Sequence, residues 1–490
     1  MVKVKILLNG NYEEYIVPNN IKTVLDALNY INKQYNRNIK FRSSCRAGQC
    51  GSCGMMINGE PRLACKTKLT EDVVIEPLKN FNVIEDLIID RSQYYKKLDS
   101  IRNYIHTSNN IENDFKISKK DMNDFKKVRN CIECLNCLAT CPSRENYNYP
   151  GPTIIRQLAR FSFDPRDEKS REEEAFFENI YSCTTCGKCM EVCPNEIDIV
   201  HKGIEKLRSK VFSKNYYLKN HLLVRDNLIK YNRSVEPQED ALLSQLKDEY
   251  IVKDEKMRVA FFTGCLIDYR LQKVGLETIR VLNAHGVSVI VPKEQICCGS
   301  PMIRTGQLDI AKKLMKHNLK VLNAFGKRDI PIITVCAGCG STLKRDYNNK
   351  DFEVLDITEV LCKVGPIEYK PYSKKITYHD PCHLNRGQGI CKEPRKILKN
   401  IPKLEFVEME NPTQCCGAGG GVRSGIPTLS KSIGMRKANM VIKTNCDNVI
   451  TICPFCEYHI RDCLNEYCKN NKIDKKVEVM NIVSLLNKVI

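Results

Sequence analysis

Residues 265–339 carry Cys265, Cys297-Cys298-Gly299 and Cys336-Ala337-Gly338-Cys339, and residues 382–456 repeat the pattern as Cys382, Cys415-Cys416-Gly417 and Cys453-Pro454-Phe455-Cys456. Equivalent cysteines lie 117 or 118 residues apart. Self-similarity at a fixed period indicates an internal duplication. The sequence therefore predicts two copies of one structural unit, at residues 258–373 and 374–490.

Each copy alternates short apolar runs with helical patterns, and a cysteine motif follows each run. The runs are 258–264, 287–291 and 331–335 in the first copy, and 375–381, 404–408 and 448–452 in the second. This order predicts β-α-β-α-β with the cysteines at the carboxyl ends of parallel strands. Ligands bind at that edge of such sheets. A zinc site or cubane cluster needs four ligands, so five thiolates predict a less usual metal cluster.

The Cys-Cys-Gly motifs resemble those of the heterodisulfide reductase catalytic subunit and related iron–sulfur oxidoreductases. The glycine-rich stretch 416–425 and the segment His379-Asp380-Pro381-Cys382-His383 also resemble that family. The resemblance implies that each set holds a noncubane [4Fe-4S] cluster that binds one thiol sulfur. Two such sites facing each other would make or break a disulfide. The catalytic cysteines that it implies are Cys265, Cys297, Cys298, Cys336, Cys339, Cys382, Cys415, Cys416, Cys453 and Cys456.

The chain begins with a pattern typical of a small [2Fe-2S] ferredoxin. Residues 2–8 and 12–17 alternate as strands around Asn9-Gly10, a strong hairpin signal, and 24–31 has helical spacing. Cys-x4-Cys-x2-Cys with a later cysteine is the plant-type [2Fe-2S] spacing. Its ligands are Cys45, Cys50, Cys53 and Cys65. The glycines of this loop let backbone N–H groups approach the sulfides.

Two copies of C-x2-C-x2-C-x3-C-P follow a stretch, 85–128, that is predicted to be helical. In two-cluster ferredoxins the fourth cysteine of each run binds the other cluster. The sequence thus predicts one [4Fe-4S] cluster on Cys131, Cys134, Cys137 and Cys193, and another on Cys141, Cys183, Cys186 and Cys189. Helical patterns at 154–159 and 197–212 predict an α-helical ferredoxin domain rather than a compact β-rich one.

Residues 1–235 resemble the iron–sulfur subunit of succinate dehydrogenase and fumarate reductase. The resemblance includes 58–65 and Pro150-Gly151-Pro152. Members of that family usually lack a cysteine at the second position of the second run and carry [3Fe-4S] there. Cys186 supplies that cysteine here, so a full [4Fe-4S] cluster is expected. The quinone site that normally adjoins a [3Fe-4S] cluster is then not expected.

The overall prediction is a multidomain α+β and α/β chain. It comprises a β-grasp [2Fe-2S] domain at 1–100, an α-helical two-cluster domain at 101–235, a linker at 236–257 and the two Cys-Cys-Gly repeats. No stretch is apolar enough for a transmembrane helix, and the start lacks the features of a signal peptide. We therefore expect a cytoplasmic protein. The net charge of +19 is dispersed, which argues against a nucleic-acid partner.

Ten further residues have no firm assignment from the sequence. Small buried hydrophobic roles are predicted for the cysteines outside the sets, which are Cys362, Cys391, Cys446, Cys463 and Cys468. Polar residues near the cysteine motifs are weak candidates for binding an anionic substrate or moving protons, with solvated or structural roles equally open. These are Arg304, Lys344, His383, Arg423 and His459.

Both resemblances together are typical of the thiol-dependent fumarate reductases. That combination implies that coenzymes M and B are oxidised to their heterodisulfide at the Cys-Cys-Gly clusters. Electrons would then pass through the [4Fe-4S] and [2Fe-2S] clusters to FAD in a partner, the flavoprotein subunit of fumarate reductase. The chain has no flavin fingerprint of its own. Two alternatives stay open: a dehydrogenase subunit that exchanges electrons with quinone, and a non-catalytic electron-transfer scaffold.

Overall fold

The computed structural model describes residues 1–107, 117–144, 148–348 and 350–490. These residues form two compact units. The first comprises Met1–Cys183 and Gly187–Tyr216, and the second comprises Thr184–Cys186 and Tyr217–Ile490. The second unit thus begins upstream of residue 235, where the sequence places a boundary. No helix of the described residues combines the length and the apolar character needed to cross a membrane.

The first unit starts with a mixed five-stranded sheet in the order β2-β1-β5-β3-β4. Its strands are β1 (Val2–Leu8), β2 (Asn11–Val17), β3 (Gly54–Ile57), β4 (Glu60–Leu63) and β5 (Val73–Glu76). The predicted hairpin is confirmed, because β1 and β2 pair antiparallel from Val2 opposite Val17 to Leu8 opposite Asn11. α1 (Val24–Gln34) is also confirmed and buries one face against this sheet. This is the expected β-grasp arrangement.

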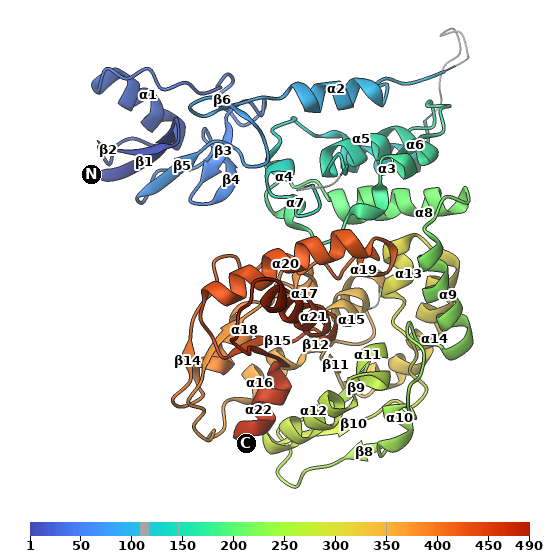
Figure 1. Cartoon of the computed structure of the whole chain (residues 1–490). Helices are drawn as coiled ribbons and strands as arrows, with labels where there is room; N and C mark the ends of the chain where they lie inside the picture. Colours follow the sequence, from blue (N-terminus) through green and yellow to red (C-terminus); the bar gives the residue numbers. More distant parts are fainter. Residues whose placement is uncertain (108–116, 145–147, 349) are drawn as a thin grey trace. The chain divides into compact units, whose positions relative to one another are not determined.

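Helices make up most of the rest of the first unit (Figure 1). They are α2 (Ser92–Ser100), α3 (Lys119–Arg129), α4 (Asn136–Ala139), α5 (Pro152–Ser162), α6 (Arg171–Phe177), α7 (Lys188–Glu191) and α8 (Lys206–Ser213), with a π-helical turn at Ile199–Glu205 and a 3₁₀ turn at Ile180–Ser182. The expected helical stretches at 154–159 and 197–212 are confirmed.

The prediction of helix over 85–128 is confirmed only for α2 and α3, and it is wrong at 101–107 and at its start. β6 (Val83–Glu85) and β7 (Ile88–Ile89) form a small antiparallel pair there, and α2 begins only at Ser92. Asp86 takes a positive φ of 48° between the two strands, a conformation that favours a turn over a helix. Residues 108–116 of that stretch lie outside the described residues.

The second unit contains two sheets with the same strand order. The first sheet, in the order β12-β11-β9-β10-β8, comprises β8 (Glu249–Tyr250), β9 (Met257–Phe262), β10 (Val287–Ile290), β11 (Ile332–Thr334) and β12 (Val354–Asp356). The second, in the order β14-β13-β15-β16, comprises β13 (Lys375–Tyr378), β14 (Glu405–Phe406), β15 (Asn448–Thr451) and β16 (Glu478–Asn481). All pairs are parallel except β8 with β10. The duplication predicted from the cysteines is therefore confirmed in the topology.

Helices of matching position accompany each sheet. In the first repeat they are α11 (Cys265–Tyr269), α12 (Gln272–Ala284), α13 (Ser300–Thr305), α14 (Leu308–Gly326), α15 (Ala337–Ser341), a π-helical turn at Thr342–Asp346 and α16 (Ile357–Val364). In the second they are α17 (Cys382–Gln388), α18 (Lys392–Lys399), α19 (Val422–Gly425), α20 (Pro427–Lys443), α21 (Pro454–Asn470) and α22 (Ile482–Val489). α9 (Lys219–Tyr231) and α10 (Leu242–Gln245) precede the first sheet.

Each repeat has one parallel strand more than the sequence predicts. β12 and β16 run directly into α16 and α22, whose first turns are capped by the side chains of Asp356 and Asn481. The strands are only three and four residues long, so their apolar pattern is too short to separate from the helices that follow.

The segment 236–257, expected as a linker, instead belongs to the fold of the first repeat. β8 pairs with β10 at the sheet edge, and Leu242, Leu243 and Leu246 are buried in the core. The Leu243 backbone N–H also donates to the buried Asp268 carboxylate at 3.0 Å. The segment is rich in charged residues, but burial of its three leucines stabilises its packing against the first repeat.

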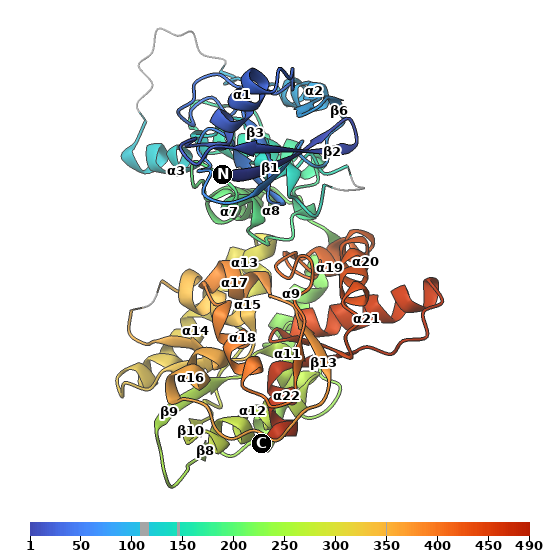
Figure 2. The ribbon, with the colours of Figure 1, turned by 90° about the vertical axis from the view of Figure 1, so that its left-hand side faces the viewer.

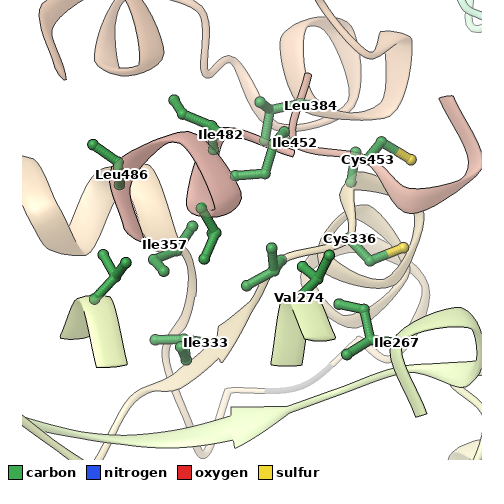
Figure 3. Packing of buried hydrophobic residues seen from close by; sticks show 14 of the residues in the cluster. Ile267, Val274, Ile333, Cys336, Ile357, Leu384, Ile452, Cys453, Ile482 and Leu486 are labelled. Atoms are coloured by element: carbon green, nitrogen blue, oxygen red, sulfur yellow. The ribbon is translucent and has the colours of Figure 1, made fainter. Parts of the chain in front are cut away.

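One apolar core joins the two repeats. Figure 3 shows Ile267, Val274 and Ile333 of the first repeat in the same cluster as Ile452 and Leu486 of the second. α12 of the first repeat packs against α22 of the second. The two sheets are thereby held as one body, with their strand ends in a fixed relation.

We expect Gly51→Ala to destabilise the first unit more than Gly59→Ala does. Both glycines have positive φ, which costs a residue with a side chain about 1–2 kcal/mol. A Cβ at Gly59 meets nothing within 4 Å, whereas one at Gly51 would lie 2.3 Å from the Ile132 carbonyl oxygen. Overpacking against backbone adds about 1–3 kcal/mol. Thermal unfolding of the two full-length variants measures the difference; equal losses would contradict the close packing described here.

Candidate functional site: ten cysteines around one cavity

All ten cysteines of the two repeated sets line one cavity of about 380 Å³ in the second unit. The cysteines come from both repeats, and every one is buried. Sulfur atoms of the two repeats adjoin at Cys336 and Cys453. A hydrogen bond from the Cys336 thiol is the main cause that lowers the pKa of Cys453 well below its usual value. Figure 3 shows both side chains at the margin of the apolar core with their sulfur atoms directed away from it.

Parallel strands bring these thiols together. Cys265 and Cys382 begin α11 and α17 just after β9 and β13, and Cys336 and Cys453 follow β11 and β15. α15 and α17, which belong to different repeats, lie side by side (Figure 2). The carboxyl edges of the two sheets therefore meet, and the cavity lies where they meet.

Tight backbone turns are needed at this edge. Gly264 has a φ of +73°, and a Cβ there would lie 2.9 Å from the Cys339 Sγ. Backbone N–H groups also donate to sulfur at matching places: Gly299 to Cys297 at 3.5 Å, and Gly417 to Cys415 at 3.3 Å. Such donors stabilise thiolate charge, as metal ligation requires.

The second cysteine of each adjacent pair has the same electrostatic environment. Hydrogen bonding from Cys297 lowers the pKa of Cys298 well below its usual value, and Cys415 does the same for Cys416. A CxxC thiol is the second cause of the lowered pKa in each case, Cys339 for Cys298 and Cys456 for Cys416. Thiolate is the form of cysteine that binds metal, so both sets are built alike at this position.

Buried cations accompany the thiols. Arg233 is 8% exposed, pairs with Asp268 at 2.7 Å and favours the charged form of Cys265. Arg304 pairs with Asp346 at 2.9 Å and favours the charged form of Cys298. Both cations act on thiols of the first repeat.

In the second repeat a buried lysine, Lys437 on α20, lies near the thiols. Its side chain is fully buried and donates to the Asn411 carbonyl at 2.6 Å. Burial lowers its pKa to about 8, while Cys416 and Cys415 act in the opposite direction. Nothing in the sequence pattern indicated a role for Lys437, because a single lysine in a helical pattern is usually solvated.

The polar candidates from the sequence separate into two groups. Arg304, His383 and Arg423 line the cavity. Lys344 and His459 are not among its described lining residues. Lys344 instead pairs with Glu359 at 2.8 Å, and His459 hydrogen-bonds the Ser430 carbonyl at 3.1 Å. Burial lowers the pKa of His459 to about 4, with Arg423 adding to the effect.

His379 lies beside two of the cavity cysteines, although it is not among the described lining residues, and the sequence reasoning did not select it. It follows β13, is fully buried, and has a ring nitrogen that lies within 4.8 Å of the Cys416 and Cys456 Sγ atoms. The sequence could have identified it, because it lies just after a β-strand and three residues before Cys382.

Three cysteines predicted for the [2Fe-2S] cluster, Cys45, Cys50 and Cys53, lie in the loop that joins α1 to β3, and Cys65 adjoins Cys53. The backbone N–H groups of Ala47, Gln49 and Cys50 all donate to the Cys45 Sγ at 3.3–3.4 Å. The Ser52 hydroxyl is the main cause that lowers the pKa of Cys50 to about 6. A loop with this many donors to sulfur fits a negatively charged cluster.

The first predicted [4Fe-4S] set also comes together. Cys131, Cys134, Cys137 and Cys193 line one small cavity of about 20 Å³. In the second set, Cys141, Cys183 and Cys189 lie near Tyr149, whose pKa is raised by burial first and by these thiols next. Cys186 is buried, and its segment Thr184–Cys186 is grouped with the second unit.

Among the described residues, none of the cysteines outside the predicted sets lines the ten-cysteine cavity. Cys446 and Cys463 are buried, and the partly exposed ones are Cys362, Cys391 and Cys468. Cys463 lies 3.7 Å from a ring nitrogen of His459.

Three known families match successive parts of the chain. Residues 6–96 match the 2Fe-2S iron–sulfur cluster binding domain, and 127–197 match the 4Fe-4S dicluster domain. Residues 259–344 and 376–461 each match the cysteine-rich domain known as CCG. The chain therefore carries [2Fe-2S] and [4Fe-4S] domains, and its CCG domains fit further iron–sulfur clusters.

Three relatives share much or all of this organisation. An uncharacterised iron–sulfur protein of Methanocaldococcus jannaschii is 59% identical over 100% of both chains. A fumarate reductase (CoM/CoB) subunit of Methanothermobacter marburgensis is 46% identical over 99% of both. A dihydromethanophenazine:CoB–CoM heterodisulfide reductase subunit of Methanosarcina barkeri is 33% identical over 68% of this chain and 88% of its own.

The first two similarities cover the ferredoxin domains and both CCG repeats together. The chain therefore belongs to the oxidoreductase family of iron–sulfur proteins that includes the fumarate reductase (CoM/CoB) subunit of Methanothermobacter marburgensis.

Proposed function

We propose that the chain is the iron–sulfur subunit of a fumarate reductase that takes its electrons from the thiols of coenzymes M and B. The observation that carries this proposal is the single cavity lined by all ten cysteines of both repeats. Forming a disulfide requires two sulfur atoms to be held next to each other. The adjoining Cys336 and Cys453 support two metal sites that would lie close enough for that purpose.

The proposed reaction balances without a further reactant. Two different thiols form one S–S bond and release two electrons and two protons. Fumarate takes up two electrons and two protons and becomes succinate. When bound, iron–sulfur clusters supply single-electron transfer and, in the CCG repeats, attachment of thiol sulfur. The chain has no flavin fingerprint, so hydride chemistry requires a partner with FAD, the flavoprotein subunit of fumarate reductase.

The ligand sets of the proposal are those expected from the spacing. The [2Fe-2S] cluster would be held by Cys45, Cys50, Cys53 and Cys65, one [4Fe-4S] by Cys131, Cys134, Cys137 and Cys193, and the other by Cys141, Cys183, Cys186 and Cys189. Two noncubane clusters would be held by Cys265, Cys297, Cys298, Cys336 and Cys339, and by Cys382, Cys415, Cys416, Cys453 and Cys456. We place the chain in the cytoplasm, where reducing conditions would keep these cysteines available as metal ligands.

The surroundings of the cavity support the binding of charged groups there. Buried Arg233, Arg304 and Lys437 offset thiolate charge, which would otherwise be costly in a low-dielectric interior. Arg423 lines the cavity and pairs with Asp462 at 2.7 Å. His383 adds a titratable imidazole to the lining, which we propose exchanges a proton with a thiol sulfur.

Metal content gives the first test of the ligand sets. The five proposed clusters together contain about 18 iron atoms per chain, whereas the three ferredoxin-type clusters alone contain about 10. We expect anaerobically prepared protein to approach the higher value in both iron and acid-labile sulfide. A value near the lower one would mean that the CCG sets are empty.

Cys186→Ser should convert one [4Fe-4S] cluster into [3Fe-4S]. Loss of one thiolate from a four-cysteine set leaves one iron without a protein ligand. Electron paramagnetic resonance of the oxidised variant should then show a [3Fe-4S] signal that freshly prepared wild-type protein lacks. A strong signal of that type in oxygen-free wild-type protein would remove Cys186 from the proposed set.

Cys298→Ser and Cys416→Ser should abolish fumarate reduction driven by coenzymes M and B, while reduction driven by reduced viologen survives. Each substitution removes one thiolate from a CCG set, whereas viologen can feed the flavin or the remaining clusters directly. Cys50→Ser should also stop thiol-driven reduction, but with thiol binding at the CCG clusters intact. The assay uses the complex with its flavoprotein partner.

Cys391→Ser is the matched control for the last prediction, because Cys391 is half-buried and does not line the cavity. It should keep both activities. If Cys298→Ser retained thiol-driven activity with its cluster shown to be altered, the CCG repeats would be an electron conduit and not the catalytic site.

A further inference from the structure

His379 is a fully buried histidine whose two ring nitrogens both lack a hydrogen-bond partner among the described residues. Burying an amide or hydroxyl without a partner costs about 1–3 kcal/mol in protein mutational data, and a buried imidazole is subject to the same penalty. Groups of this kind in a native fold therefore require an explanation, such as an ion that the site binds. The other buried histidine of the second repeat, His459, has protein partners by contrast.

The ring is placed at a metal-binding distance from two of the cavity cysteines. One nitrogen of His379 and the Sγ atoms of Cys416 and Cys456 all lie within 4.8 Å of one another, and the two sulfur atoms are 3.5 Å apart. Ligands of one tetrahedral ion lie about 3.5–4 Å from each other, given metal–sulfur bonds of about 2.3 Å. The three atoms thus surround a point that one metal ion could occupy after a small contraction.

The first repeat has no equivalent of this side chain. Aligning Cys382 with Cys265 places His379 on Phe262, which is equally buried. The two five-cysteine sets therefore have matching thiols, but the second set has His379 where the first has Phe262. A neutral nitrogen in place of a thiolate raises the reduction potential of an iron–sulfur centre.

We propose that His379 is a nitrogen ligand of the metal centre in the second CCG repeat, on the ion shared with Cys416 and Cys456, and that the two repeats thus hold chemically different centres. This inference rests on the proposed function only in requiring a metal centre in that repeat. The five-cysteine sets alone do not imply it.

The test uses the full-length chain with its clusters, labelled with ¹⁵N-histidine, and pulsed electron paramagnetic resonance. Wild-type protein should show the hyperfine coupling of a directly bonded nitrogen, several-fold larger than one across a hydrogen bond. His379→Phe, which installs the residue that the first repeat has at this position, should lose that coupling. His379→Cys should lose it as well, retain the iron, and lower the reduction potential of one centre.

The matched control is His285→Phe in the first repeat. His285 is equally buried, but its ring nitrogens already bond the Val281 carbonyl at 2.7 Å and the Tyr369 hydroxyl at 2.9 Å. This variant should lose stability and keep the nitrogen coupling. It separates the loss of a ligand from the general loss of a buried imidazole.

The outcomes distinguish this inference from the proposed function. Iron near 18 atoms per chain without a bonded nitrogen, or with the coupling retained in His379→Phe, would overturn the ligand role alone. Iron near 10 atoms per chain would leave the second repeat without a centre and overturn both. If His379→Phe fails to fold, His379→Cys alone decides, because it keeps a ligand at the same place.

Discussion

The second unit depends on placing ten thiols in an interior that excludes water. A buried thiolate is costly unless a metal, a donor or a cation compensates its charge. The fold supplies donors through the N–H groups of Gly299 and Gly417, and cations through Arg233, Arg304 and Lys437. Much of what surrounds the cavity can be understood as this compensation. Bound metal would complete it and would thereby contribute directly to the stability of the unit.

Duplication fixes the geometry, and later divergence changes the chemistry. Both repeats have the same strand order, and in both the pKa of the second cysteine of the adjacent pair is lowered by its neighbour. Around these shared thiols the neighbours differ. Aligning Gly425 with Gly306 places Lys437 on Asn318, a neutral residue that donates to the Cys297 carbonyl. The two cysteine sets thus have different electrostatic surroundings although their thiols match.

Much of the fold was predictable because the spacing of the cysteines relates distant parts of the sequence to one another. Short apolar patterns carry no such information. The duplicated cysteines predicted the parallel units, and the Asn9-Gly10 turn predicted the first hairpin. The additional strands β12 and β16 were missed since each is too short to show a period. The leucines of 236–257 were missed because a charged composition concealed them. Lys437 was missed as well, since its burial depends on Asn411, which lies on another segment.

The shared core explains why both cysteine sets belong to one site. A disulfide-forming site with one set on each of two loosely joined domains would lose its geometry with every relative motion. Here Ile333 and Ile452 of different repeats lie in one apolar cluster, and the Ser484 hydroxyl of the second repeat donates to the Glu277 carboxylate of the first. Because packed interiors resist displacement, the adjoining Cys336 and Cys453 are held by residues that never touch the cavity. Precision at the sulfur atoms is therefore a property of the whole duplicated unit and not of its loops.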